Sequence, residues 1–239
     1  YGASVTIIEK NKRVGRKIMI TGKGRCNLAN NCDVQTFINN VPVNGRFLYS
    51  AINAFTPEDT IEFFESKGLK TKTERGNRVF PASDRSVDVV DTMHDYAVES
   101  GCKIVCDTAN ALILEDGAVI GVKCEENTYY ADSVIICCGG KSYPLTGSTG
   151  DGYTLAKQAG HTIVPLKPSL VPFTSNDKQC KDMQGLALKN VALRIVDKNS
   201  KKTVYSDFGE MLFTHFGMSG PMILSASSHP VSYTHLTLP

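Results

Sequence analysis

The sequence predicts an α/β fold built on a parallel sheet of the dinucleotide-binding, Rossmann-like kind. Two short apolar runs carry this prediction: one contains Val5, Ile7 and Ile8, and the other is SVIICC at Ser133–Cys138. Such runs are typical of strands that are buried on both faces of a parallel sheet. Glycine and polar residues follow each run, and open α/β sheets bind ligands at the carboxyl ends of their strands.

The first strand ends at an acidic residue, Glu9. In dinucleotide-binding βαβ units an acid at the end of the second strand accepts hydrogen bonds from ribose hydroxyls, although a glutamate after a strand is commonly a solvated loop residue. Seven basic residues follow, and the last of them alternate with Gly22 and Gly24. Glycines let backbone N–H groups face an anion, and basic side chains neutralise its charge. The seven are Lys10, Lys12, Arg13, Arg16, Lys17, Lys23 and Arg25.

Three helices are expected between the two apolar strands. Thr56, followed by proline and then by Asp59, marks one helix start, and Asp84 or Ser86 is expected to cap another. A glycine follows each of these two helices and predicts its end. The expected helices are Arg46–Phe55, Pro57–Lys67 and Ser86–Ser100, with a candidate edge strand at Leu69–Thr73. Glu74–Asp84 is expected to be loop-like, with a turn signal at Gly76-Asn77 and a short extended piece at Val79-Phe80.

An antiparallel insert is expected after the third helix. Its central feature is Asp116-Gly117, a hairpin turn signal between two β-rich runs. Ser133–Cys138 then returns the chain to the parallel sheet, and Gly139-Gly140 turns away from it. A TGDG motif precedes a helix at Tyr153–Ala159, for which Asp151 suits the N-cap. The expected insert strands are Lys103–Cys106, Ala109–Glu115, Ala118–Cys124 and Thr128–Ala131.

The composition excludes several classes of protein. The 239 residues are 41% hydrophobic and 21% charged, as in ordinary globular domains, and the net charge of +2 argues against a general nucleic-acid or membrane-surface binder. The eight cysteines contain no CxxC pair, so we expect no metal site. No apolar run approaches the ~20 residues of a membrane helix, and there is no secretory signal. Reduced thiols in a cytoplasmic protein are therefore expected.

Five separated motifs carry a resemblance to a known family. They are IIEKNKRVGRKIMITGKGRCN (Ile7–Asn27), ERGNRVFPASDRS (Glu74–Ser86), GGKSYPLTGSTGDGYTLAKQAGH (Gly139–His161), PSLVPF (Pro168–Phe173) and FTHFGMSGP (Phe213–Pro221). With these motifs the chain resembles the BaiN-type (YhiN-like) FAD-dependent oxidoreductases, also described as aminoacetone-oxidase-type flavoproteins, to about Ser227. The resemblance implies an FAD-binding Rossmann-like fold of the two-dinucleotide-binding-domain flavoprotein type, with an antiparallel β insert and a partial β-barrel-like second domain.

The resemblance also implies a division of the chain. We place a domain boundary near Val164, where prolines accumulate and alternating strands such as Val191–Val196 begin, with a turn at Asn199-Ser200. No GxGxxG motif is present, so the first domain is expected to lack its first βα unit. The tail VSYTHLTLP has no apolar period and is expected to be foreign. The expected parts are an incomplete FAD-binding domain at 1–163, a partial β-rich insert domain at 164–229 and a foreign tail at 230–239.

The resemblance implies how FAD would be held. Glu9 would bind the adenosine ribose, two basic residues would lie near the adenosine half, and three glycine-containing segments would surround the pyrophosphate and flavin. Ala111 stands where related flavoproteins often place a valine whose backbone contacts adenine, although an ordinary strand residue explains it as well. Cys26 is expected to be a small buried residue rather than a redox thiol. The expected cofactor-binding residues are Glu9, Arg16, Lys17, Gly22, Gly24, Arg25, Cys26, Asn27, Ala111, Gly139, Gly140, Ser142, Gly150 and Asp151.

The function that the resemblance implies is hydride transfer from NAD(P)H through FAD to an electron-poor small molecule such as an enone. His215 is a candidate general acid, although the glycines around it favour a turn residue. We expect a small-molecule substrate and neither nucleic acid nor membrane as a partner, and the oligomeric state stays open. Two alternatives are an RNA-modifying flavoprotein and a non-catalytic fragment that cannot hold FAD.

Overall fold

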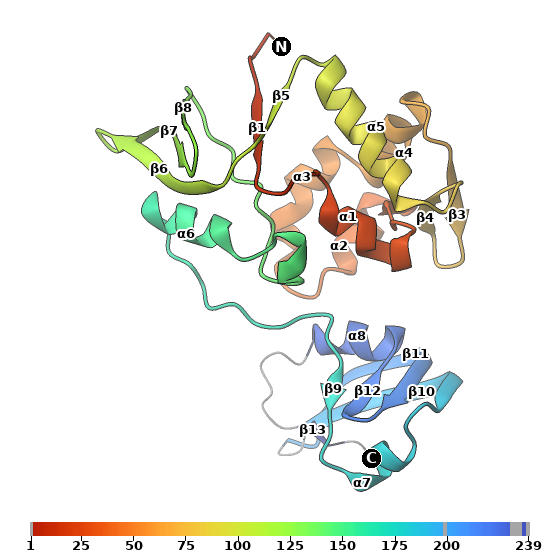
Figure 1. Cartoon of the computed structure of the whole chain (residues 1–239). Helices are drawn as coiled ribbons and strands as arrows, with labels where there is room; N and C mark the ends of the chain where they lie inside the picture. Colours follow the sequence, from red (N-terminus) through yellow and green to blue (C-terminus); the bar gives the residue numbers. More distant parts are fainter. Residues whose placement is uncertain (1, 198–199, 230–235, 238–239) are drawn as a thin grey trace. The chain divides into compact units, whose positions relative to one another are not determined.

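The computed structural model describes residues 2–197, 200–229 and 236–237, in two compact units (Figure 1). Backbone contacts assign Tyr1–Ile163 to the first unit and Val164–Pro239 to the second. Each unit is described by itself. Of the helices in the described ranges, none has the length and apolarity that crossing a lipid bilayer requires.

A parallel pair of strands runs through the first unit. β1 (Thr6–Glu9) pairs with β5 (Lys103–Cys106), as expected for a sheet of the predicted kind. The prediction that this first strand is buried on both faces is wrong, because the side chains of Val5 and Ile7 are 43% and 36% exposed. Within the described residues β5 is the one strand that pairs with β1, so neither strand is covered as a central strand would be. Of the three apolar residues in this run, Ile8 is the one that packs against the apolar cluster that contains Leu112 and Val122 of the antiparallel insert.

The antiparallel insert forms from three of its four predicted strands. The prediction that Lys103–Cys106 belongs to the insert is wrong, because this strand is β5 and pairs in parallel with β1. β6 (Ala109–Glu115), β7 (Ala118–Cys124) and β8 (Thr128–Tyr130) make a three-stranded antiparallel sheet. The turn between β6 and β7 has positive φ at both Asp116 (49°) and Gly117 (79°), the geometry that asparagine, aspartate and glycine favour in tight hairpins. In Figure 1 the insert lies on one side of the β1–β5 pair and helices α4 and α5 on the other.

Asp107 fixes the insert to the end of β5. Its buried carboxylate accepts hydrogen bonds from the backbone N–H groups of Thr108, Glu126 and Asn127 at 2.8 to 3.1 Å. Burial favours the neutral acid, but the hydrogen bonds to the charged form outweigh it and lower the pKa of Asp107 below its ordinary value. The carboxylate is therefore expected to stabilise the folded state only while it is ionised.

The lowered pKa gives a prediction for acid stability. A carboxyl group whose folded pKa lies below its unfolded pKa stabilises the fold above the unfolded pKa, and this stabilisation is lost as pH falls through the folded pKa. Asp107→Asn should therefore lower the thermal midpoint at neutral pH and flatten its fall below about pH 4. Thermal unfolding followed by circular dichroism from neutral to acid pH measures this, with the exposed Asp132→Asn as control. Identical acid profiles for wild type and Asp107→Asn would contradict it.

A helical layer lies on the other side of the parallel pair. Helix α4 (Pro57–Ser66) begins as predicted: the Thr56 hydroxyl accepts from the Asp59 N–H, and the Asp59 carboxylate accepts from the Thr56 N–H at 2.7 Å. The predicted cap of α5 (Ser86–Glu99) is wrong, because the N-cap residue is Arg85 and makes no side-chain capping bond. The Ser86 hydroxyl instead donates to the carbonyl of Met19 at 2.8 Å, which ties α5 to helix α1.

The stretch predicted as a loop contains the central strand of a second antiparallel sheet. β4 (Arg78–Pro81) lies between β2 (Ala29–Asn30) and β3 (Thr71–Glu74). The turn predicted at Gly76-Asn77 is confirmed as the turn of the β3–β4 hairpin, with positive φ at both residues. The short extended piece predicted at Val79-Phe80 lies within β4, which the description of the stretch as loop-like understated. The remaining elements of the first unit are α1 (Arg16–Ile20), η1 (Thr21–Gly24), α2 (Val34–Asn39), η2 (Gly45–Leu48), α3 (Tyr49–Ala54), η3 (Pro144–Thr146) and α6 (Asp151–Gln158).

The second predicted parallel strand is absent from the described structure. Ser133–Cys138 has no regular secondary structure, and Ile135 is 85% exposed. An apolar run becomes a strand only where a neighbour completes its backbone hydrogen bonds, and no described strand pairs with this run. Helix α6 follows, but Asp151 is its first residue rather than its N-cap; Gly150, with φ of 93°, holds the N-cap position.

The second unit is a single antiparallel sheet with a helix packed on it. The strand order is β13-β10-β11-β12-β9, and the side chains of Met222, Ile223 and Ala226 in α8 are buried in a core with Ile195 and Met211. The elements are β9 (Phe173–Thr174), α7 (Lys178–Asp182), β10 (Ala187–Asp197), β11 (Thr203–Thr214), β12 (Gly217–Ser219), α8 (Pro221–Ser227) and β13 (Leu236–Thr237).

The prediction of a barrel-like second domain is wrong. In the described residues the edge strands β13 and β9 do not pair with each other, so the sheet stays open. A barrel needs every strand to have two neighbours, and the short strand β9 pairs with β12 alone. The predicted turn residue Asn199 and most of the predicted foreign tail at 230–239 lie outside the described residues.

Candidate functional site

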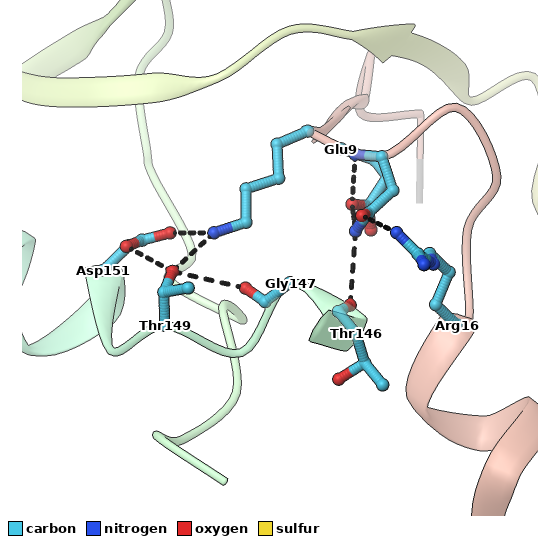
Figure 2. Close-up of polar contacts among 8 residues, drawn as sticks. Glu9, Arg16, Thr146, Gly147, Thr149 and Asp151 are labelled. Atoms are coloured by element: carbon cyan, nitrogen blue, oxygen red, sulfur yellow. Dashed lines mark hydrogen bonds and ion pairs between the residues drawn. The ribbon is translucent and has the colours of Figure 1, made fainter. Parts of the chain in front are cut away.

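Two segments far apart in the sequence meet beside the end of β1. The first is the post-β1 loop, residues 10–15, and the second is the glycine loop, residues 139–150, which leads into α6. Figure 2 shows the polar contacts that join them, with Glu9 and Arg16 on one side and Thr146, Gly147, Thr149 and Asp151 on the other. The sequence predicted cofactor-binding residues in the glycine loop and at both ends of the post-β1 loop, where Glu9 precedes it and Arg16 follows it.

Glu9 is held from one side by the residue two positions later. Its Oε1 accepts from the Asn11 backbone N–H at 2.8 Å and from Asn11 Nδ2 at 2.6 Å. The described residues make no hydrogen bond to Oε2, and the side chain is half-buried. Asn11 Oδ1 in turn accepts from Arg16 Nη1 at 2.9 Å. Glu9 therefore has a fixed orientation and one carboxylate oxygen free to accept hydroxyl groups.

Gly147 allows the glycine loop to approach Asn11 closely. Its φ is 96°, and a Cβ atom at this position would lie 2.5 Å from Asn11 Nδ2. The same Nδ2 donates to the carbonyl of Thr146 at 3.4 Å. A side chain at position 147 would thus push away the amide that orients Glu9.

A second set of contacts joins the loops through a charged pair. Lys10 Nζ lies 2.5 Å from Asp151 Oδ2 and 2.6 Å from Thr149 Oγ1, and the Thr149 hydroxyl donates to Asp151 Oδ1 at 2.8 Å. The hydrogen bond from Lys10 lowers the pKa of Asp151, although partial burial opposes this shift. The Asp151 carboxylate therefore stays charged at neutral pH and faces Lys10.

Lys17 makes a third contact between the segments. Its Nζ donates to the carbonyl oxygen of Ser142 at 2.6 Å and to Ser142 Oγ at 3.1 Å. Gly139 and Gly140 lie on the same loop, and Gly139 has φ of 69°. The structure thus brings together eight predicted residues: Glu9, Arg16, Lys17, Gly139, Gly140, Ser142, Gly150 and Asp151.

The GKGRCN turn forms a separate group at the other end of α1. This helix has five residues, which corresponds to a length of about 7.5 Å. Gly22 and Gly24 have φ of 54° and 84°, and a Cβ on Gly22 would lie 3.0 Å from the backbone nitrogen of Asn27. The turn therefore depends on its glycines. Glycine is the residue that allows a backbone to adopt positive φ and to approach a ligand or another segment closely.

Arg25 is already paired within the structure. Its guanidinium lies 2.5 Å from Glu74 and 2.7 Å from Asp84, and it stacks on the Phe80 ring at 4.1 Å. Asp84 also pairs with Lys72 at 2.5 Å. The charges of two carboxylates and two basic side chains cancel in this cluster. Through its ion pairs, Arg25 anchors the turn to the β3–β4 hairpin and the residues that follow it.

Cys26 lies inside an apolar cluster. Its side chain is 6% exposed and packs with Phe64, Leu69 and Val89. Burial raises the pKa of the Cys26 thiol, which disfavours the reactive thiolate. The structure gives it the surroundings of a packing residue, beside the turn rather than open to a ligand.

The burial of Cys26 predicts slow chemical modification. Iodoacetamide should leave Cys26 unmodified under native conditions while the exposed thiol of Cys106 reacts, because alkylation requires an accessible thiolate. Peptide mass spectrometry of the full-length protein after timed labelling measures both rates, and labelling in denaturant provides the fully reacted reference. Equal native rates at the two cysteines would contradict the prediction.

Two predicted residues lie outside both groups. Ala111 is in β6, within the antiparallel insert, where it pairs with Lys123 of β7. His215 belongs to the second unit, in the two-residue turn between β11 and β12, where its exposed ring packs against Phe216 at 4.9 Å. The structure thus gives His215 the turn position that its neighbouring glycines favour.

Sequence reasoning missed several residues that build the site. Asn11, Thr146 and Thr149 were not singled out, and Lys10 was counted only as one of seven basic residues. Thr149 belongs to the TGDG motif, which was a usable signal. Asn11 gave no such signal, because an asparagine two residues after a strand is usually a turn residue.

Comparison with known proteins places the chain in a family. Residues 1–226 match the model of the HI0933-like protein Rossmann domain. The chain is 30% identical over 228 residues to the 3-dehydro-bile acid delta(4,6)-reductase of Clostridium scindens. It is 29% and 28% identical to the ribosomal RNA dihydrouridine synthases of Escherichia coli and Haemophilus influenzae.

Each of these alignments covers 95% of this chain, and 54%, 55% and 56% of the respective relative. The chain thus spans about half the length of the curated relatives it matches. The family match extends over both units and includes all five motifs described above. The chain therefore belongs to the family of HI0933-like proteins with a Rossmann domain.

Proposed function

We propose that the protein is an FAD-dependent oxidoreductase that reduces an electron-poor carbon–carbon double bond. The observation that carries the proposal is the arrangement of Glu9: a carboxylate at the end of a parallel strand, with one oxygen open and a glycine loop fixed beside it. In Rossmann-type folds this is the position of the acid that binds ribose hydroxyls. Membership of the HI0933-like family supports the same cofactor class.

The residues that are present fit an extended dinucleotide. Glu9 would accept from the ribose hydroxyls through Oε2. Arg16, which directly precedes Lys17, is held by Asn11. The glycine loop would face the pyrophosphate. Positive φ at Gly139 and Gly150 allows backbone N–H groups to point toward an anion. The GKGRCN turn would contact FAD farther along α1 through its backbone.

FAD, when bound, supplies the hydride chemistry, and the protein supplies orientation and charge. Glu9 would fix the adenosine end, and Lys17 holds Ser142 and with it the start of the glycine loop. We propose NAD(P)H as the electron donor. His215 stays our candidate proton donor to the reduced substrate, and a His215→Asn variant that keeps full turnover would remove it from that role.

The substrate class follows from what the relatives' names share. A bile acid delta(4,6)-reductase and a dihydrouridine synthase both form a product in which a carbon–carbon double bond is reduced. A double bond conjugated with a carbonyl group accepts hydride because the carbonyl takes up the charge. We therefore propose an enone-type acceptor for this protein, with a small molecule as the first candidate.

The test begins with the full-length protein and its visible spectrum. Purified protein should carry FAD, anaerobic NADH or NADPH should bleach the flavin bands, and a small enone should restore them. Protein that binds no FAD from solution would contradict the proposal, and flavin that is reduced but not reoxidised by any enone would contradict the substrate class.

A second candidate is reduction of uridine in RNA. The similarity to two ribosomal RNA dihydrouridine synthases over nearly the whole chain favours it, although the net charge of +2 gives no broad basic surface. Incubation with ribosomal RNA and NADPH would then add two hydrogens to a uridine, detectable by mass spectrometry of RNA digests. Salt-dependent RNA binding without this mass change would not support an RNA substrate.

A further inference from the structure

A partly buried ion pair joins the two loops of the site. Lys10 and Asp151 are 141 positions apart in the chain, and their charged groups lie 2.5 Å from each other. Their side chains are 26% and 37% exposed, so water screens the pair only in part. Thr149 closes the contact, because its hydroxyl accepts from Lys10 and donates to Asp151.

In the described fold neither charged group has a hydrogen-bond partner outside this contact, although Asp151 also places a negative charge in the first turn of α6. Asp151 opens helix α6 but makes no capping bond, since Gly150 occupies the N-cap without a side-chain acceptor. Lys10 follows Glu9 directly, and its described hydrogen bonds go to Asp151 and Thr149. The contact between the two side chains therefore fixes the start of α6, and with it the end of the glycine loop, beside Glu9.

We propose that Lys10 and Asp151 are positioning residues that hold the glycine loop against the ribose-binding end of β1. This inference rests on the proposed function, because the surface that the two residues assemble is the one assigned to FAD. Asp151 then acts through Lys10 rather than by touching the cofactor, and Lys10 acts as a tether rather than as a counter-ion for phosphate. The contact adjoins the Asn11–Gly147 approach, because a Cβ at Gly147 would also lie 3.3 Å from Lys10 Cε.

Charge reversal separates a tether from a counter-ion. In the double variant Lys10→Glu/Asp151→Lys the ion pair is kept with its signs exchanged, so a tether survives. A counter-ion for phosphate would instead be replaced by a negative charge, and FAD binding would worsen beyond that of either single variant. Recovery in the double variant is thus the distinguishing result.

The first measurement does not involve FAD. Hydrogen–deuterium exchange of the full-length protein without flavin should show faster amide exchange in residues 143–150 for Asp151→Asn, and wild-type exchange in the charge-reversed double variant. The exposed Asp132→Asn should leave the loop unchanged. Equal exchange of this segment in wild type and Asp151→Asn would overturn the inference.

The second measurement is FAD affinity, followed by flavin fluorescence. Asp151→Asn and Lys10→Met should each weaken binding about fivefold, as expected for a partly exposed pair, and the charge-reversed variant should recover most of the loss. Single variants that bind like the wild type, or a double variant weaker than both, would overturn the inference. Failure of the wild type to bind FAD would instead overturn the proposed function, while the exchange measurement would still decide whether the pair fixes the loop.

Discussion

Glu9→Ala should weaken FAD binding about 10- to 150-fold. This range corresponds to the ~1.5–3 kcal/mol that a hydrogen bond to a charged group contributes. In the structure the Glu9 carboxylate is oriented by two bonds from Asn11 and keeps Oε2 open. The variant removes both the acceptor for the ribose and the group around which Asn11 is ordered. Titration of the flavin-free full-length protein with FAD measures the loss.

A second substitution separates charge from shape at this position. Glu9→Gln keeps an acceptor oxygen of similar size but no charge, so it should lie between the wild type and Glu9→Ala. The control is Glu99→Ala at the exposed end of α5, which removes a carboxylate of the same kind far along the sequence. Unchanged FAD affinity in Glu9→Ala would remove Glu9 from the cofactor site, and with it the observation on which the proposed function depends.

Gly147→Ala should both destabilise the protein and weaken FAD binding. A left-handed φ costs a non-glycine residue about 1–2 kcal/mol, and here the new methyl group would also meet Asn11 Nδ2 at 2.5 Å. Either the amide or the glycine loop must move, and both movements disturb the group that orients Glu9. Chemical denaturation gives the change in the free energy of unfolding, and titration gives the change in FAD affinity.

The chain offers a matched control for the backbone cost. Gly160 has φ of 86°, close to the 96° of Gly147, but a Cβ there would meet nothing within 4 Å. Gly160→Ala should therefore show the loss of stability without the loss of FAD affinity. If the two variants bind FAD equally well, the close approach of Gly147 to Asn11 does not matter for the cofactor.

The local elements were predictable because their signals lie within a few residues. The capping box of Thr56 and Asp59 forms the start of α4, and the Asp116-Gly117 turn forms the β6–β7 hairpin. In both cases the interacting groups are neighbours in sequence, so the local chemistry decides the structure. The family was also predictable, because each of its five motifs is a short continuous stretch and all five are present in order.

The errors in the predicted strands and sheets concern partners that are distant in sequence. An apolar run such as Ser133–Cys138 is necessary for a buried strand, but its backbone also needs a neighbouring strand, which the run itself does not specify. The open sheet of the second unit and the exposure of β1 have the same origin. Hydrophobic content measures how much surface a segment can bury, and not which segment will cover it.

The sequence by itself determined the family, the helices α4, α5 and α6, the β6–β7 hairpin, and the identity of Glu9 as the acid at the end of the first strand. Only the tertiary structure decided how that acid is oriented: Asn11 holds it, Gly147 makes room for Asn11, and Lys10 reaches Asp151 across 141 positions. Contacts of this kind depend on how the chain folds back on itself over long distances. Their energies are set by geometry in space, which residue patterns over a few positions do not encode.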